Sequence, residues 1–488
     1  MSGEGSRRSE PGDLPPEEFR RLAHGVADWM ADYLEGVGTL PVFPDVTPGF
    51  LRDALPERPP EQAEDMDAVL EDFRRLVLPG ITHWNHPAFH AWFSITGSAP
   101  GILGEMLAAT LNVNAMVWRS SPAATELEEH TLDWLRMLLG LPEGFMGTIN
   151  DTASHSTLYA LAAAREDALG DRGGEGLAGG PRLRCYASAE AHSSVDKAVL
   201  TLGLGRAGLR RVGVTSALEM DPDALAASIR ADRAAGDRPM AVVATLGTTS
   251  TNAVDPLGAV AEICAEEKVW LHVDAAYGGP LALLPELHDL FAGWEAADSI
   301  VVNPHKWLFT PVDCSALYCR RPELLRRAFS LTPEYLRTDE GDEVTNLMDY
   351  GVALGRRFRS LKLWFVLRAF GAQGIRDRLR HHLELAAEWV RQVEEAPGWE
   401  MAAPCPMATP VFRYRPPGTR GDACDAMNQA ILDRVNASGV AFLSHTRVGG
   451  RLALRLSIGN LRTTRAHLAR TWDRLLQEAE GLVEGGSS

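Results

Sequence analysis

The 488-residue sequence has few cysteines and no excess of basic residues. Its six cysteines show no CxxC or metal-ligand spacing, so no metal site is predicted. Lysine and arginine together number 48 against 65 aspartates and glutamates, which gives a net charge of −17. This balance argues against binding to nucleic acid or to an anionic membrane surface. The cysteines considered are Cys185, Cys264, Cys314, Cys319, Cys405 and Cys424.

Long apolar runs are also missing. No stretch of 18 or more apolar residues occurs, so no transmembrane helix is predicted. Residues 1–19 are polar and lack the apolar region of a secretory signal. Most of the cysteines stand in apolar strand or helix contexts, where a free cysteine behaves as a small hydrophobic residue. We therefore expect a cytoplasmic, metal-free protein.

Strands and helices alternate from about residue 96 onward. Apolar segments such as 239–248 and 269–277 are each preceded or followed by a helical pattern. Continuous apolar strands between helices indicate a mostly parallel sheet that is buried on both faces. The fold class expected is therefore α/β.

The chain divides into three predicted regions. Residues 1–95 contain two helical patterns and a proline-rich extended segment, and this arm needs a partner surface to bury its apolar stripe. Residues 96–370 form the large α/β domain. Residues 371–488 combine long helices with short strands, which predicts a smaller α+β domain.

Two of the polar sites that follow predicted strands lie before helices. Thr152 and Ser154 stand where a strand turns into a helix, so that N–H groups and hydroxyls could hold a phosphate. The alternative is an ordinary helix cap. His192 stands at a similar junction, where it is either a solvated or capping residue or part of a site.

Two more sites carry charges beside apolar strands. Asp274 ends a strongly apolar strand, where an unpaired carboxylate would be costly, so it either protonates or has a cationic partner. An ion pair with a nearby arginine is the simpler alternative. Lys306 follows the next strand, and a desolvated lysine has a lowered pKa and becomes a nucleophilic amine. Its alternative is a side chain that reaches to solvent.

Taken together, these sites fit one cofactor, pyridoxal 5'-phosphate (PLP). Its aldehyde needs a lysine, its ring nitrogen a carboxylate, its ring a stacking partner and its phosphate a helix N-terminus. The sequence supplies all four in an alternating β/α context. The combination predicts a PLP site more strongly than any single residue does.

The chain resembles the group II PLP-dependent decarboxylases, specifically the aromatic-L-amino-acid decarboxylase branch. The resemblance runs from about residue 18 to 475 and is carried by collinear blocks such as "PGITHWNHPAF", "VATLGTTSTNAVDPL", "WLHVDAAYGG", "NPHKWL" and "LGRRFRSLKLW". It implies the fold-type I PLP architecture. That architecture has a mostly parallel, seven-stranded-type sheet with helices on both faces, an N-terminal helical arm and a small C-terminal α+β domain.

The resemblance also implies roles for individual residues. Lys306 would form the Schiff base with the cofactor, and Asp274 would pair with its ring nitrogen. His192 would stack on the ring, and Ala276 would pack against the other face. The other cofactor-binding residues implied are Ala153, Ser154, Asn303 and His305 at the phosphate, and Thr249 near the phenolic oxygen.

The predicted reaction is decarboxylation of an aromatic L-amino acid to an arylalkylamine and CO2. A polar segment at 331–346 has no core pattern and is predicted to be a loop. In the resembling enzymes this loop carries a tyrosine that donates a proton to the substrate, and Tyr335 matches it. Related aldehyde synthases carry a different residue there, so Tyr335 favours a decarboxylase.

The substrate pocket matches less well. The animal enzymes carry a proline and a threonine at the positions of Ser94 and Ile95, and an isoleucine and a phenylalanine at those of Asn114 and Met116. Gly355 is the small residue that the family associates with room for an indole. The pocket residues expected are Trp92, Phe93, Ile95, Thr96, Asn114, Met116 and Gly355.

Several alternatives remain open. An aldehyde synthase is disfavoured by Tyr335, whereas a decarboxylase of a non-aromatic amino acid is left open by Ile95, Asn114 and Met116. An inactive binding or scaffold homologue is the remote alternative. The resemblance further implies a homodimer whose subunits share each active site.

Overall fold

The computed structural model describes residues 12–331 and 343–485, and a seven-stranded sheet forms its centre. The strand order is β1-β7-β6-β5-β4-β2-β3. Strand β7 runs antiparallel to both of its neighbours and the other pairs are parallel, so the predicted mostly parallel sheet is confirmed. The strands are β1 (Met146–Asn150), β2 (Leu183–Ser188), β3 (Leu209–Val212), β4 (Arg238–Thr245), β5 (Trp270–Asp274), β6 (Ser299–Val302) and β7 (Ser315–Cys319).

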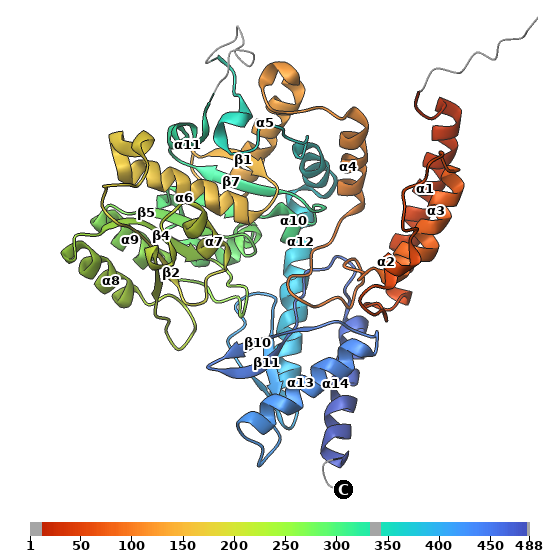
Figure 1. The fold of residues 1–488 in the computed structure, drawn as a ribbon. Helices are drawn as coiled ribbons and strands as arrows, with labels where there is room; N and C mark the ends of the chain where they lie inside the picture. Colours follow the sequence, from red (N-terminus) through yellow and green to blue (C-terminus); the bar gives the residue numbers. More distant parts are fainter. Residues whose placement is uncertain (1–11, 332–342, 486–488) are drawn as a thin grey trace, which may run out of the picture.

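Helices cover both faces of this sheet (Figure 1). Successive strand residues point to opposite faces, and both faces are apolar here. In β4, Val242 and Ala244 belong to one buried cluster, whereas Ala241 and Val243 belong to the other. The first cluster includes residues of α5 (Pro122–Leu138), α8 (Pro222–Ala234) and α9 (Leu257–Glu267), and the second includes residues of α6 (Ala153–Leu169), α7 (Ser194–Thr201) and α11 (Pro322–Phe329).

A four-stranded antiparallel sheet forms the smaller part of the molecule, in the order β10-β11-β9-β8. Helix α12 (Ser360–Glu395) runs from the large sheet towards it (Figure 1). Gly371, at φ 62°, interrupts this helix beside the domain boundary predicted at residue 370. That boundary stays a prediction. The other elements are β8 (Trp399–Met401), β9 (Val411–Tyr414), α13 (Asp422–Ala437), β10 (Ser444–Val448), β11 (Arg451–Arg455) and α14 (Arg465–Gly485).

The N-terminal arm stands beside the rest of the molecule (Figure 1). It contains α1 (Pro16–Gly36), α2 (Phe50–Ala54) and α3 (Met66–Asp72), and α4 (Ala99–Leu111) follows it. Within the arm, the ring of Trp29 packs edge-on against Phe73 at a centroid distance of 5.2 Å. Helix α1 buries only Leu22, so most of its surface is open in a single chain. Among the described residues, none of the helices has the length and apolarity that crossing a membrane requires.

Candidate active site

A cavity of about 200 Å³ lies at the carboxyl edge of the large sheet. Strands β1, β2, β4, β5 and β6 all point their carboxyl ends to this edge, which is where ligands bind in α/β folds. The cavity brings together all the residues predicted to bind the cofactor. It is lined by Phe93, Thr152, Ala153, Ser154, His192, Thr245, Gly247, Thr249, Asp274, Ala276, Tyr277, Asn303, His305 and Lys306.

Lys306 lies in the short helix α10 (Pro304–Trp307), directly after β6. Its Nζ atom is 4.7 Å from the centroid of the Phe93 ring. Burial lowers the pKa of the amine to about 8, an effect that Asp274 opposes and Arg455 reinforces. The side chain therefore lines the cavity with an amine that is easier to deprotonate than an exposed lysine.

Asp274 ends β5 and is 6% exposed. Its Oδ1 atom accepts a hydrogen bond from the backbone N–H of Ala276 at 3.1 Å. The alternative of an arginine ion pair is not found, since no cation pairs with this carboxylate among the residues that the structure describes. A buried carboxylate at a cavity wall can accept further hydrogen bonds, and a protonated ring nitrogen is a suitable donor for one of them.

His192 and Ala276 line the cavity near this carboxylate. The N–H of Ser194 donates to Nδ1 of His192 at 3.1 Å, which fixes the ring and leaves the proton on Nε2. His192 is exposed in the single chain, but partial desolvation at the cavity wall lowers the pKa of its ring, so the ring is neutral at pH 7. Ala276 is buried and has no side chain beyond Cβ, which leaves room for a flat ring beside it.

The start of α6 and the turn after β6 provide hydrogen-bond donors. Thr152 precedes α6, but its side chain does not cap the helix. The first backbone N–H groups of the helix, at Ala153 and Ser154, therefore have no hydrogen bond from a cap, and both residues line the cavity. Unbonded N–H groups at the start of a long helix are suited to a phosphate. The same edge carries the side chains of Asn303 and His305.

The hydrogen bonds of His305 fix which atoms face the cavity. The backbone N–H of Cys314 donates to Nδ1 of His305 at 2.9 Å, so Nε2 carries the proton. Burial lowers the pKa of His305 to about 4, so the ring is neutral. Nδ2 of Asn303 lies 3.4 Å from that Nε2, and Oδ1 of Asn303 has no hydrogen-bond partner within the described part of the chain. In either orientation of the amide, an N–H group is left without an acceptor, and a phosphate oxygen would supply one.

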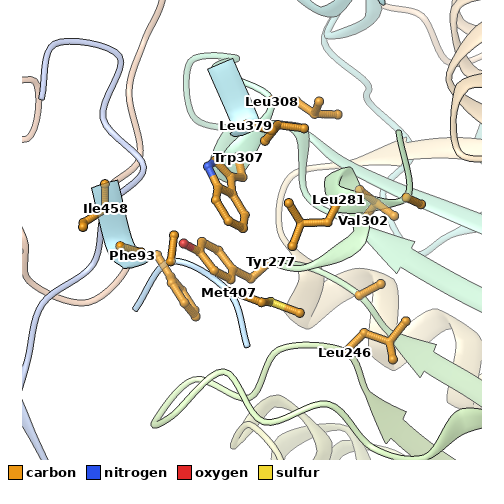
Figure 2. Close-up of a cluster of buried hydrophobic side chains, with 14 of the residues drawn as sticks. Phe93, Leu246, Tyr277, Leu281, Val302, Trp307, Leu308, Leu379, Met407 and Ile458 are labelled. Carbon is orange, nitrogen blue, oxygen red and sulfur yellow. The ribbon is translucent and has the colours of Figure 1, made fainter. Parts of the chain in front are cut away.

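Phe93, Tyr277 and Trp307 form an aromatic stack (Figure 2), and its Phe93 ring contacts Lys306. Phe93 stacks on Tyr277 at a centroid distance of 3.9 Å, and Tyr277 stacks on Trp307 at 4.7 Å. Such pairs add stability beyond their buried area. The stack joins the extended segment before α4 to the chain just after β5 and to α10.

The other predicted pocket residues near Phe93 lie outside the cavity lining. Trp92 is 50% exposed and stacks on Trp84 at 5.3 Å. Thr96 is buried, and its Oγ1 accepts a hydrogen bond from the N–H of Leu461 at 3.3 Å. Ile95 is half-buried. Of this group, only Phe93 lines the cavity.

Asn114, Met116 and Gly355 form a separate group. Oδ1 of Asn114 accepts a hydrogen bond from the N–H of Arg356 at 2.8 Å, and Nδ2 of Asn114 lies 3.5 Å from the sulfur of Met116. Asn114 and Gly355 are exposed. None of the three lines the cavity around Lys306, and Tyr335 lies outside the described residues.

Some residues at the site were not predicted. Thr245, Gly247 and Tyr277 line the cavity, and Arg455 lies against Phe93, with its Cζ atom 4.8 Å from the ring centroid. The signal for Arg455 was a charged residue within the apolar strand sequence "RLALRLSI". Nothing in the sequence links it to Phe93, which is 362 positions away.

The fold and this cavity together define the fold-type I PLP-dependent enzymes: a lysine, a carboxylate, a neutral ring and a donor-rich helix start meet at the carboxyl edge of a mostly parallel sheet. The family model of the pyridoxal-dependent decarboxylase conserved domain matches residues 48–415, so the chain belongs to the pyridoxal-dependent decarboxylases. It is therefore a lyase, and its cofactor is PLP.

Within that family, the chain falls in the aromatic-L-amino-acid decarboxylase branch. It is 38% identical over 480 residues to phenylacetaldehyde synthase from Arabidopsis thaliana, covering 96% of this chain and 97% of the relative. The crystal structure of Oryza sativa TDC with PLP and tryptamine has a TM-score of 0.94 at 37% identity, covering 97% and 99% of the two chains. Tryptophan decarboxylase of Catharanthus roseus in complex with L-tryptophan has a TM-score of 0.91 at 36% identity, covering 97% and 100%. The predicted family, fold and cofactor are confirmed.

Proposed function

We propose that this protein decarboxylates an aromatic L-amino acid to the arylalkylamine and CO2. The observation that carries the proposal is the meeting of Lys306, Asp274 and His192 in one cavity. Relatives in the same branch include a tryptophan decarboxylase solved with L-tryptophan, which supports an aromatic substrate. An inactive scaffold would have no need for a buried amine beside an unpaired carboxylate.

PLP, when bound, supplies an aldehyde that captures the amino group and a ring that accepts the electron pair of the broken bond to the carboxylate. Lys306 is the amine that holds the cofactor and exchanges with the substrate. Asp274 holds a proton at the ring nitrogen through a charge-assisted hydrogen bond. His192 and Ala276 would pack against the two faces of the ring.

The donors at the other end of the cavity anchor the phosphate. Ala153 and Ser154 offer backbone N–H groups at the start of α6, and Asn303 and His305 offer side-chain N–H groups. Thr249 lies at the cavity wall, where it would be near the phenolic oxygen of the cofactor. Because these groups are fixed by β1, β6 and their turns, they position the cofactor without rearrangement.

Tyr335 is the proposed donor of the proton that replaces the carboxylate on the substrate carbon. A phenol with a pKa near 10 is protonated at pH 7 and can supply that proton. This role separates an amine-forming enzyme from an aldehyde-forming one, because an unprotonated carbon is open to oxidation.

Product analysis tests the proposal. The PLP-loaded protein is incubated with tryptophan, tyrosine, phenylalanine, dopa and 5-hydroxytryptophan beside the non-aromatic amino acids, and amines, aldehydes and peroxide are quantified. Arylalkylamines with equimolar CO2 are expected. Amines from aliphatic or acidic substrates alone would contradict the aromatic assignment and leave the lyase chemistry standing.

A second candidate is an aldehyde synthase. The relative that favours it is phenylacetaldehyde synthase, which shares 38% of its residues with this chain. Arylacetaldehyde with peroxide, in place of amine, would establish this candidate. A non-aromatic decarboxylase is the further candidate that Ile95, Asn114 and Met116 leave open.

We infer further that the enzyme is a homodimer. Helix α4 packs Gly104 so closely on α12 that a Cβ atom there would lie 2.7 Å from Cα of Lys362. The same helix also exposes a row of large apolar residues at helical spacing, and the arm exposes Phe19 and Val69. Sedimentation analysis should show two copies of the 53.1 kDa chain, and a monomer would contradict the inference. The exposed row is Leu103, Met106, Leu107 and Leu111.

A second copy would explain the separate pocket group. Val352 and Leu354 are exposed beside Gly355, and the hydrogen bond from Arg356 to Asn114 holds this segment next to the end of α4. Asn114, Met116 and Gly355 therefore lie on the same apolar surface that a second copy would cover. From that surface they would complete the substrate pocket of the other subunit.

A further inference from the structure

Among the described residues, the buried cation of Arg455 has no counter-charge. It ends β11 and is 3% exposed. Its Nε donates to the carbonyl of Ser250 at 3.2 Å, and its Nη1 donates to the carbonyl of Trp92. Its Nη2 has no hydrogen-bond partner, and no carboxylate pairs with it among residues 12–331 and 343–485. Burying an unpaired guanidinium is costly, so the position is expected to serve a purpose.

The ring of Phe93 brings Arg455 close to Lys306. The Cζ atom of Arg455 lies 4.8 Å from the ring centroid, and the Nζ atom of Lys306 lies 4.7 Å from the same centroid. Each cation is attracted by the ring, whose position is fixed by its stacking on Tyr277. Two positive groups are thereby held near each other in a buried space, where charges interact more strongly than in water.

The other titratable groups around the amine are Asp274, His192, His305 and Tyr277. Burial lowers the pKa of both histidines and raises that of Tyr277 to about 12, so all three are uncharged at pH 7. Asp274 and Arg455 are then the charges that act on Lys306.

We propose that Arg455 is a positioning residue that disfavours the charged form of the Lys306 amine, so that a larger fraction of this amine is neutral and nucleophilic than in an exposed lysine. The repulsion between the two cations disfavours the ammonium form of Lys306. Phe93 holds both groups so that the repulsion is not relieved by movement. The inference rests on the proposed role of Lys306 and adds the residue that prepares it.

Trace labelling with acetic anhydride measures this directly. The full-length chain freed of cofactor is labelled from about pH 6 to pH 11, and modification of Lys306 is quantified by mass spectrometry. The neutral amine attacks a carbonyl carbon of the anhydride, an amide forms, acetate leaves and the amine proton passes to solvent. We expect half-maximal labelling near pH 8 in the unsubstituted chain, from the lowered pKa of Lys306. Arg455→Gln should shift this midpoint upward by about one pH unit.

Two variants separate charge from structure. Arg455→Lys retains the positive charge and should restore the midpoint, whereas a loss of packing alone would move both variants equally. Arg462→Gln is the matched control, because Arg462 is a half-buried arginine of the same part of the molecule that does not contact Phe93. Circular dichroism checks the fold, and Arg455→Met replaces Arg455→Gln if the glutamine variant does not fold.

An unchanged midpoint in the folded neutral variant would overturn the proposal. The proposed function is tested separately by adding PLP, reducing with borohydride and locating the cofactor. Cofactor attached to Lys306 with an unchanged midpoint would reject the role of Arg455 alone. Cofactor attached elsewhere would reject the role of Lys306, whatever the midpoint.

Discussion

Two groups of residues predicted for one active site lie in different surroundings. The cofactor group, around Lys306 and Asp274, is built from the ends of five strands and lies within a cavity of a single chain. The group of Asn114, Met116 and Gly355 lies outside it, with Asn114 and Gly355 exposed. The first group is fixed by the fold of one chain, whereas the second takes part in the site only under the proposal that a second copy covers it.

The two groups are therefore expected to control different properties of the enzyme: the first the reaction itself, and the second the choice of amino acid. Residues of the cavity are held by backbone elements and hydrogen bonds, as His305 is by Cys314. Residues of the exposed group also have hydrogen bonds, as Asn114 has with the backbone N–H of Arg356, but Asn114 and Gly355 lie at the surface. Substitutions in the first group should therefore abolish the reaction, and substitutions in the second should change which amino acid is used.

The largest effect is expected for Lys306→Ala. The variant loses the amine that holds the cofactor and exchanges with substrate, so its turnover should fall by about 10³-fold or more. Steady-state amine production measures this. Lys268→Ala, at an exposed lysine directly after α9, is the control and should retain full activity. Activity of the Lys306 variant within tenfold of the parent would contradict the assigned role.

Asp274→Asn should reduce turnover by about 10²–10³-fold, because a neutral amide no longer stabilises the protonated ring nitrogen. Asp255→Asn, at a second buried carboxylate, is the control. That carboxylate is buried but accepts backbone hydrogen bonds from Met220 and Thr245, both at 2.7 Å, and so acts on stability. Kinetics and thermal unfolding of the two variants should separate them, and equal loss of turnover would refute the distinction.

Tyr335→Phe should lower amine production by about 10²–10⁴-fold, the range for a lost general acid. Arylacetaldehyde and peroxide are expected to appear in its place. Chromatography of the products with a peroxide assay measures both. Unchanged amine output without aldehyde would show that another group supplies the proton.

Gly355→Leu should change preference with less effect on chemistry. A larger side chain beside Asn114 would reduce the kcat/KM for tryptophan relative to phenylalanine by about 10–100-fold. Competition between the two substrates gives this ratio. An unchanged ratio would place Gly355 outside the pocket. Gly258→Ala is a suitable control, because a Cβ atom there would make only ordinary van der Waals contacts. Gly140→Leu is unsuitable, because Gly140 has φ 71°.

The smallest effect concerns stability against pH. The pKa of Lys306 is about 8 in the folded cofactor-free chain, below its ordinary value of 10.5. The buried ammonium therefore destabilises the fold below pH 8, and this penalty disappears as the pH rises from 8 to 10.5. Lys306→Met should be more stable than the parent by about 1–3 kcal/mol at pH 7, with the difference closing across that window. Urea unfolding at several pH values measures it, and a constant difference would contradict the lowered pKa.

Much of the cofactor site was predictable because it follows the parallel sheet. Asp274 and Lys306 each stand at or just after the carboxyl end of a strand, and such ends meet at one edge. The alternation of apolar strands and helices therefore sufficed to bring them together. The motif resemblance added the roles of Ala276 and Thr249, which no periodicity indicates.

The contacts of Phe93 could not be predicted in the same way. Its stacking on Tyr277 and its contact with Arg455 join distant segments by side-chain packing, which leaves no local pattern in the sequence. The separation of Gly355 from the cavity around Lys306 could not be predicted either, because it depends on how distant segments pack in the folded chain.

The proposal that two subunits share each active site is tested most directly by mixing two inactive variants, Lys306→Ala and Tyr335→Phe, and allowing their subunits to exchange. If one copy completes the site of the other, mixed dimers carry Lys306 from one chain and Tyr335 from its partner. Activity should then return to about a quarter of the parent rate, because half of randomly paired dimers are mixed and each has one intact site. A mixture no more active than its components would contradict the shared site.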